Sequence, residues 1–395
     1  MKMTTNNIPQ GYKDSPLGII PEEWEIKKLG EVCIFIKSGK NKEKSNEGLF
    51  HVFGSTGIIG FTNKYVYNCP LLLIARVGAN AGFIYYINEK CDVSDNTLIL
   101  RLNSSYDFIF AYNQLKQYNL NRLIFGSGQP LITASLLKNI KISFPPLPEQ
   151  QKIAEVLSTW DKAIEKQSQL IEKLELRKKG LMQQLLTGKK RLPGFSSKWK
   201  TIKLGDISKR IVRRNINEQC TNVVTISAQK GFIRQTDFFN KKVASETIEN
   251  YYLVKRNEFC YNKSYSNGFP MGAIKRLKEF DQAVVTTLYI CFAVQEESIS
   301  VDFIEQYFSL GLLNRGLMKI ANEGGRAHGL LNVTPNDFFN INLNLPPIDE
   351  QKAISSILFN AYNEVVLAKN KIKSLQQQKK GLMQVLLTGK KRIIQ

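Results

Sequence analysis

The chain has 395 residues, 43% of them hydrophobic, which is enough for two or three domains with cores of their own. Its 55 lysines and arginines against 34 acidic residues give a formal charge of +21, which favours a polyanionic partner, with nucleic acid ahead of a membrane surface. No apolar run approaches the ~18 residues of a membrane span, and the polar N-terminus lacks a signal-peptide core, so we predict a cytoplasmic protein.

The first part of the chain predicts an arm followed by a mixed α/β domain. Residues 1–23 are polar and rich in proline, which indicates an extended arm. Residues 24–144 open at Trp24 and contain short β-like runs such as 71–75 and 97–102, separated by glycine-bearing turns. One helix is expected near 107–120, and the region has the size of a normal domain.

Residues 145–187 predict a long helix. The stretch begins after Pro145-Pro146 and ends at Thr187-Gly188, which are typical boundaries of a helix. With Ile153 at heptad position a, apolar side chains occupy most a and d positions over five heptads. About 36 residues at ~1.5 Å each give a helix of roughly 54 Å. Residues 188–198 are then expected to form a linker.

The same series then occurs a second time. A second mixed α/β domain is predicted for residues 199–345, opening at Trp199, with a β-like run over 283–294 and a helix near 301–320. A second long helix with a tail is predicted for 346–395. The helical stretches match at a constant offset of 201 residues without a gap, which indicates an internal two-fold repeat. We expect the two helices to separate the domains and to pack as an antiparallel coiled coil. The alternative is that each helix lies on its own domain, but surface helices rarely sustain so long a seam.

Motifs for chemistry are absent from the sequence. There is no Asn-Pro-Pro-Tyr/Phe methyltransferase tetrapeptide, Phe53–Gly57 fits a turn better than a cofactor loop, and Thr187–Lys190 lacks the rest of a phosphate-binding loop. Six scattered cysteines without a Cys-x-x-Cys pair, and only two histidines, exclude an ordinary zinc site and suggest buried thiols. We therefore predict no metal, no cofactor and no catalytic site, and hence a protein that is not an enzyme.

Basic and polar residues on glycine-bearing loops are the candidate functional residues. Lysine and arginine suit phosphates, and Asn, Gln and Ser suit base edges. Each loop could instead be a solvated turn, but the set together with the charge of +21 favours contact with DNA. The candidate DNA-binding residues are Lys37, Lys40, Ser55, Thr56, Arg76, Asn80, Ser127, Gln129, Arg213, Arg214, Gln229, Lys230, Lys263, Ser264, Ser266, Asn267, Arg326 and His328.

The repeated landmarks also resemble a known family. Pro-Pro-x-x-Glu-Gln at 145 and 346, helix ends reading Gly-Leu-Met-Gln-x-Leu-Leu-Thr-Gly, and Trp-x4-Leu-Gly at 24 and 199 resemble the DNA-specificity subunit of type I restriction–modification systems. The resemblance implies two target-recognition domains, each reading one half of a bipartite site in double-stranded DNA. It further implies that the helices dock two modification subunits, which carry S-adenosylmethionine and methylate adenine at N6. Two ATP-dependent restriction subunits, which translocate and cleave DNA, would join them.

Three other interpretations remain open at this point. The chain could be the recognition subunit of a type IIG-like fused methyltransferase–nuclease system, which shares the architecture. An enzyme acting directly on nucleic acid would need a catalytic cluster, which the sequence lacks. A structural coiled-coil adaptor would explain neither the charge nor the loops.

Overall fold

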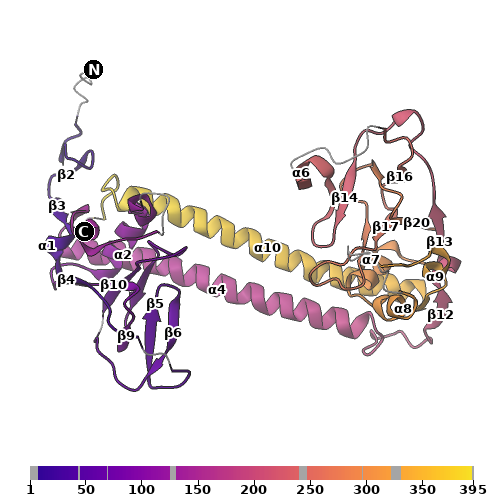
Figure 1. Cartoon of the computed structure of the whole chain (residues 1–395), viewed down its shortest axis with the longest axis horizontal. Helices are drawn as coiled ribbons and strands as arrows, with labels where there is room; N and C mark the ends of the chain where they lie inside the picture. The colour runs from indigo at the N-terminus through magenta and orange to yellow at the C-terminus, as the bar shows by residue number, and fades with distance from the viewer. Residues whose placement is uncertain are drawn as a thin grey trace. The chain divides into compact units, whose positions relative to one another are not determined.

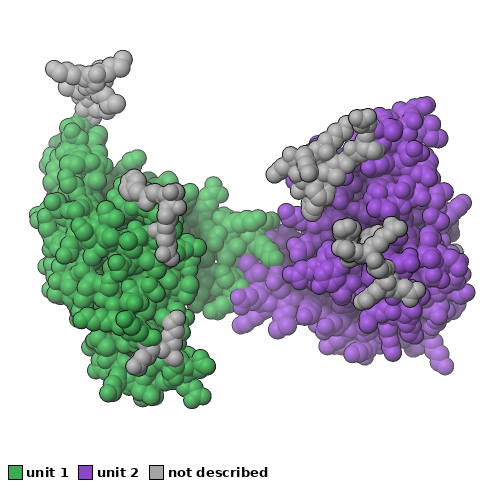
Figure 2. Space-filling model, viewed as in Figure 1, with its two compact units in different colours: residues 1–170, 368–395 green, residues 171–367 purple. Residues whose placement is uncertain are grey.

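The computed structural model describes residues 8–42, 45–68, 70–124, 130–239, 247–295, 297–321 and 331–393. The chain forms two compact units, shown in different colours in Figure 2. The first unit comprises residues 1–170 and 368–395, and the second comprises residues 171–367. Both boundaries fall inside long helices, α4 (Leu147–Leu185) and α10 (Ile348–Leu386), labelled in Figure 1. Each unit therefore contains one α/β region, the start of one long helix and the end of the other.

The first unit is built on a four-stranded antiparallel sheet of order β4-β10-β7-β8 and a three-stranded sheet of order β6-β5-β9. Strand β7 is entirely buried, which explains its unbroken apolar run. The strands are β1 (Tyr12–Lys13), β2 (Ile20–Pro21), β3 (Glu25–Lys28), β4 (Cys33–Ser38), β5 (Phe50–Gly54), β6 (Gly57–Thr62), β7 (Leu71–Ala75), β8 (Ile84–Ile87), β9 (Cys91–Val93), β10 (Thr97–Leu102) and β11 (Lys141–Phe144). The helices beside α4 are α1 (Leu29–Val32), α2 (Phe108–Tyr118), η1 (Leu120–Leu123) and α3 (Ala134–Lys138).

The second unit repeats the four-stranded antiparallel sheet, here of order β13-β20-β17-β18, and adds the pairs β14-β15, β16-β19 and β12-β21. The strands are β12 (Lys200–Lys203), β13 (Ser208–Ile211), β14 (Val224–Ser227), β15 (Gly231–Arg234), β16 (Tyr252–Lys255), β17 (Phe259–Asn262), β18 (Ala273–Arg276), β19 (Gln282–Val285), β20 (Ile290–Val294) and β21 (Asn342–Leu345). The helices are α5 (Leu204–Ile207), η2 (Ile216–Glu218), α6 (Gln235–Phe239), α7 (Val301–Ser309), α8 (Asn314–Ile320) and α9 (Pro335–Phe339). The predicted mixed α/β class is confirmed.

Two predicted elements are divided in the structure. The helix expected over 301–320 is interrupted between α7 and α8, where Gly311 has a φ of 77° that a helix does not tolerate. The β-like run over 283–294 is two strands, β19 and β20, joined by a turn in which the amide of Tyr289 donates to the carbonyl of Thr286. In both places the apolar pattern continues across a break between two elements, which hydrophobicity alone does not reveal.

The glutamine of each Pro-Pro-x-x-Glu-Gln motif ties a long helix to its α/β region. The Nε2 of Gln150 donates to the carbonyl of Pro145 at 2.8 Å, while its Oε1 accepts from the amide of Asp107 at 2.9 Å. Gln351 makes the same two bonds, to Pro346 at 2.8 Å and from Ser300 at 2.9 Å. Because Asp107 and Ser300 are the N-caps of α2 and α7, the motif fixes two helix starts at once.

The glutamate of the same motif binds the end of the other repeat. In the first unit, buried Glu149 accepts from Arg392 at 2.8 and 2.9 Å and from the Trp24 indole at 3.3 Å. In the second unit, fully buried Glu350 accepts from Arg191 at 2.6 and 2.7 Å and from Trp199 at 3.3 Å. We call these two groups the Glu–Arg–Trp clamps.

The helices pack antiparallel in each unit. In the first unit, Asp161 pairs with Lys379 at 2.5 Å, and Gln167 donates to the carbonyl of Ala368 at 3.1 Å. In the second, Arg177 pairs with Glu364. The ends of the helices also enter the cores: Leu386 and Leu387 lie in the first core, and Leu185 and Leu186 in the second. The predicted antiparallel helix pair is therefore confirmed, and the surface-helix alternative is wrong.

Two further predictions can be compared with the structure. No described helix is both long and apolar enough to span a membrane. Of the cysteines that the structure describes, Cys91, Cys220, Cys260 and Cys291 are buried and Cys33 is half-buried. Cys69 lies outside the described residues.

Candidate nucleic-acid interface

In the first unit, the loops that leave neighbouring strand ends come together around Arg76. The Nη1 of Arg76 donates to the Ser38 hydroxyl at 3.3 Å, at the end of β4, and its backbone amide donates to Asn96 at 3.0 Å. The amide of Lys40 donates to the carbonyl of Val93 at 3.1 Å, which holds the loop after β4 against the same sheet end. Asn80 lies in the turn that follows Arg76, so Lys40, Arg76 and Asn80 belong to one group of loops.

Arg76 carries a charge that this surface does not neutralise. Among the described residues it forms no ion pair, and its Nε is buried without a hydrogen-bond partner. A partly buried guanidinium without a carboxylate is costly, and a phosphate or a guanine edge would provide acceptors in the planar geometry that arginine prefers. Arg76 is therefore the strongest anion-binding candidate of the first unit.

Three of the remaining predicted residues of the first unit lie on β4 and in the β5–β6 turn. Lys37 is exposed on β4, with its Nζ over the rings of Phe35 at 4.4 Å and Tyr67 at 5.4 Å. Ser55 and Thr56 form the tip of the β5–β6 hairpin, where the Tyr85 hydroxyl donates to the carbonyl of Ser55 at 3.2 Å. Ser127 and Gln129 lie outside the described residues.

In the second unit, two loops leave adjacent strand ends at one edge. Gln229 and Lys230 are exposed in the turn between β14 and β15. The loop from Lys263 to Gly272 follows β17, and Asn262 at its start donates to the carbonyl of Ile226 on β14 at 3.1 Å. This bond places the two loops side by side. We call the second loop the 263–272 loop; it also contains Ser264, Ser266 and Asn267.

The 263–272 loop is held in a defined shape. The Ser264 amide donates to the Asn262 side chain at 3.0 Å, and the Tyr261 hydroxyl donates to the carbonyl of Met271 at 2.9 Å. Gly272 has a φ of 72°, and a Cβ there would lie 2.3 Å from the carbonyl oxygen of Asn262, so only glycine fits. Burial lowers the pKa of Lys263, which has no ion-pair partner among the described residues. A nearby phosphate would stabilise the charged form of this ammonium group.

Other basic residues of the second unit are occupied by structural contacts. Arg213 donates to both carboxylate oxygens of Glu258 at 2.8 and 3.0 Å. Arg214 donates to the carbonyl of Asn250 and lies 5.0 Å from the Tyr252 ring. These contacts make Arg213 a weaker DNA candidate than the sequence suggested, because its charge is already balanced. Arg326 and His328 lie outside the described residues.

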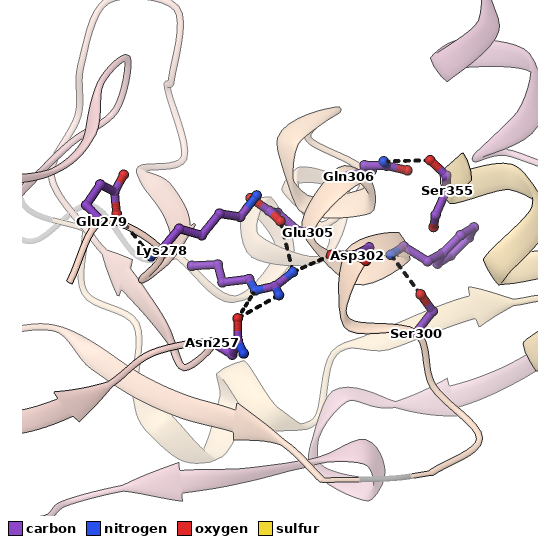
Figure 3. Close-up of polar contacts among 10 residues, drawn as sticks. Asn257, Lys278, Glu279, Ser300, Asp302, Glu305, Gln306 and Ser355 are labelled. Atoms are coloured by element: carbon purple, nitrogen blue, oxygen red, sulfur yellow. Dashed lines mark hydrogen bonds and ion pairs between the residues drawn. The ribbon is translucent and has the colours of Figure 1, made fainter. Parts of the chain in front are cut away.

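Figure 3 shows a second group of neutralised charges, at the start of α7. Arg276 pairs with Asp302 at 2.5 Å and Glu305 at 3.2 Å, and Lys278 pairs with Glu305 at 2.6 Å. Asn257 accepts two further bonds from Arg276, at 2.6 and 3.0 Å. This network attaches α7 to β18, so these cations serve the fold rather than the candidate interface.

Two features of the site were missed at the level of sequence. Tyr265 in the 263–272 loop is 63% exposed, and an aromatic ring beside Ser264 and Ser266 offers a stacking surface for a base. The clamp arginines Arg191 and Arg392 were predicted only as parts of the linker 188–198 and of the stretch 346–395, although their constant offset of 201 was a usable signal. Within the described residues, no group of His, Cys, Asp or Glu is arranged to hold a metal ion.

Comparisons with known proteins agree with this architecture. A family model described as the type I restriction modification DNA specificity domain matches residues 21–176. The MjaVIII specificity subunit of Methanocaldococcus jannaschii is 24% identical over 95% of this chain and 94% of its own length. The putative MjaX specificity subunit of the same organism is 26% identical over 97% of both chains.

Solved structures show the same fold. The type I S subunit from M. genitalium superimposes with a TM-score of 0.59 at 18% identity, covering 98% of both chains. A chain from a structure of type I restriction–modification complex assembly gives a TM-score of 0.54 at 16% identity, covering 94% of this chain and 99% of that one. Nothing in these comparisons supports the type IIG alternative. The similar curated proteins are named as specificity subunits, and one of the similar structures describes the assembly of a type I restriction–modification system. Residues 21–176 therefore match the DNA specificity domain of type I restriction–modification systems, and the chain is similar over nearly its whole length to specificity subunits of such systems.

Proposed function

We propose that each unit reads one half of a bipartite site in double-stranded DNA. The observation that supports this most directly is that each unit has its own core and its own group of loops with unbalanced cations. In the first unit these are the loops around Arg76, with Lys40 and Asn80. In the second they are the β14–β15 turn and the 263–272 loop. The predicted domain limits, 24–144 and 199–345, contain these loops.

The two kinds of side chain have separate roles in the proposal. Lys40, Arg76, Lys230 and Lys263 contact phosphates and fix the register on the duplex, because charge attracts the backbone of any sequence. Amide and hydroxyl groups read base edges in the grooves. They are Asn80, Ser55 and Thr56 in the first unit, and Gln229, Ser266 and Asn267 in the second. We expect the isolated chain to bind DNA weakly, and the net charge of +21 makes this binding strongly dependent on salt.

The partners in the proposal follow from the family. Two modification subunits dock on the long helices, supply S-adenosylmethionine, and methylate adenine in each half-site. Two ATP-dependent restriction subunits join when the complex cleaves. This chain itself takes no cofactor, and the complex works in the cytoplasm, where it meets the DNA that it modifies. The helices set the distance between the half-sites.

A domain exchange tests whether the two units recognise their half-sites independently. Residues 24–144 are replaced by the matching region of a relative with a different site, and the methylated motif is read by methylome sequencing of the host. One half of the motif should change while the other half and the spacer stay. The reciprocal exchange of residues 199–345 is the matched control and should change the opposite half.

Two results would contradict the proposal. If both halves of the motif change in either exchange, the units do not read independently. If methylation stays complete and unchanged, the exchanged region does not read DNA. A loss of all methylation is resolved by co-purification of the modification subunit with the chimera, which separates failed assembly from failed recognition.

A further inference from the structure

The start of α10 exposes an apolar face in the second unit. Phe359 is 58% exposed and Tyr362 is 54% exposed, and Val366 is half-buried beside them. Residues three and four apart lie on one face of a helix, so these three side chains form a continuous stripe, which we call the 359–366 stripe. The seam positions Leu358 and Val365 are buried, whereas Phe359 and Tyr362 are more than half exposed, so most of the stripe lies outside the seam of the helix pair.

The other half of the repeat has polar residues at the same positions. The offset of 201 places Ser158, Asp161 and Glu165 of α4 where Phe359, Tyr362 and Val366 lie in α10. Both helices are 39 residues long, begin at corresponding positions and carry the same Glu–Arg–Trp clamp. The backbone at these positions thus accepts polar residues, and nothing in the repeated fold requires aromatic ones.

A lysine common to both halves shows what this difference does. In the first unit, Lys379 is buried and paired with Asp161 at 2.5 Å. Its counterpart in the second unit, Lys178, lies 5.8 Å from the ring of Tyr362 and has no carboxylate partner among the described residues. The second unit therefore presents an apolar stripe next to a cation whose counter-charge has been removed.

We propose that the 359–366 stripe is an additional docking surface for one modification subunit, so that the two halves of this chain bind their modification subunits unequally. The contacting segment of that partner would be apolar, with a carboxylate placed to take the role that Asp161 plays in the first unit. This inference rests on the proposed function, in which modification subunits dock on the long helices. The second half would bind more tightly and fill first during assembly.

Other occupants fit the surface less well. DNA would pair with Lys178 but gains nothing from an exposed phenylalanine and valine on a helix. A second copy of this chain would bring another +21 charge to a surface that already holds an unpaired cation. An acidic, apolar protein segment matches both features, because it buries the stripe and neutralises the lysine.

The repeat itself supplies the test variants. Phe359→Ser with Tyr362→Asp and Val366→Glu gives the second half the residues of the first, and the introduced aspartate provides Lys178 with the partner that Lys379 has. Ser158→Phe with Asp161→Tyr and Glu165→Val makes the opposite change. Leu176→Gln is the control, because Leu176 is 72% exposed in the same unit and its counterpart is Gln377.

Stepwise binding of the purified modification subunit from the same locus is measured by titration calorimetry, with native mass spectrometry to count bound copies. The natural chain should bind its first copy at least about tenfold more tightly than statistics predict for two equal sites, because burial of one large apolar side chain is worth about that factor. The first triple variant should lose this preference, the second should strengthen the weaker site, and Leu176→Gln should behave as the natural chain.

The possible outcomes are distinguishable. If the modification subunit binds but both steps are equal, or the first triple variant keeps the preference, the inference is wrong while the proposed function stands. If no modification subunit binds to any chain, the proposed function fails and the inference fails with it. If the natural chain dimerises in the absence of partner and the first triple variant does not, a second copy is the occupant and the inference is overturned.

Discussion

Replacing Arg392 by methionine should open the first unit locally without unfolding the second. Methionine keeps the apolar stem of the arginine and removes only its charge and its donors. Arg392 bridges Glu149, at 2.8 and 2.9 Å, and Glu23, at 2.6 Å, and the hydrogen bond to Glu149 raises the pKa of the arginine. Its loss therefore leaves a carboxylate without its counter-charge.

The burial of Glu149 sets the size of the effect. The glutamate side chain is only 7% exposed, and after the change its remaining hydrogen bond is that from Trp24 at 3.3 Å. Breaking a buried ion pair on one side costs about 3–5 kcal/mol, because an uncompensated charge stays in the interior. Glu149→Gln added to Arg392→Met removes that charge, so the double variant should be more stable than Arg392→Met alone.

Hydrogen exchange followed by mass spectrometry measures this cost in each unit separately. Peptides from 8–24 and 385–393 should exchange roughly a hundredfold faster in Arg392→Met, which corresponds to about 3 kcal/mol. Peptides of the second unit serve as an internal reference. Arg177→Met is the matched control, because the Arg177–Glu364 pair is about half exposed and should cost ~1 kcal/mol or less.

The reasoning fails if Arg392→Met is no more disruptive than Arg177→Met. It also fails if the double variant is less stable than the single one, since the buried charge would then not be the cause. Equal acceleration of exchange in both units would show that the clamp does not act locally. Arg191→Met should give the corresponding result in the second unit, where Glu350 is fully buried.

Three further predictions concern DNA. Lys263→Met should leave the thermal stability unchanged or raise it, because the substitution removes a partly desolvated cation. The slope of log DNA affinity against log salt concentration should fall by about the value of one phosphate contact. An unchanged slope would exclude Lys263 from the interface. Gly272→Ala should reduce the sequence specificity of methylation at one half-site only, because the new Cβ of residue 272 collides with the carbonyl of Asn262 and changes the shape of the 263–272 loop. Unchanged specificity would show that the shape of the loop is irrelevant. Inserting seven residues after Gln167 and seven after Ala368 keeps the heptad phase and adds ~10.5 Å to each helix. The spacer between the two half-sites of the methylated motif should then grow by roughly three base pairs. An unchanged spacer in an active variant would show that the helices do not set its length.

The sequence predicted the long-range plan of the chain better than the state of single charges. A constant offset of 201 and a heptad seam suffice for two α/β regions and an antiparallel helix pair, because both patterns extend over many residues. The Glu–Arg–Trp clamp could not be predicted from the sequence, because Glu149 and Arg392 are separated by 243 positions. The ion pair of Arg213 could not be predicted for the same reason, because its partner Glu258 lies 45 residues away; the place of Arg213 at the DNA surface stays a prediction. Whether a cation is free depends on tertiary neighbours that composition does not specify.

Comparison of the two halves separates residues that serve the fold from residues that serve function. Gln150 and Gln351 make the same bonds in their own units, as do the two clamps, so their identity is explained by folding alone. The opposite holds for Tyr362, whose counterpart Asp161 supports the same helix position with different chemistry. The repeated fold thus accepts either residue at this position. In the docking proposal, the exposed aromatic residue is explained by what that half of the molecule binds.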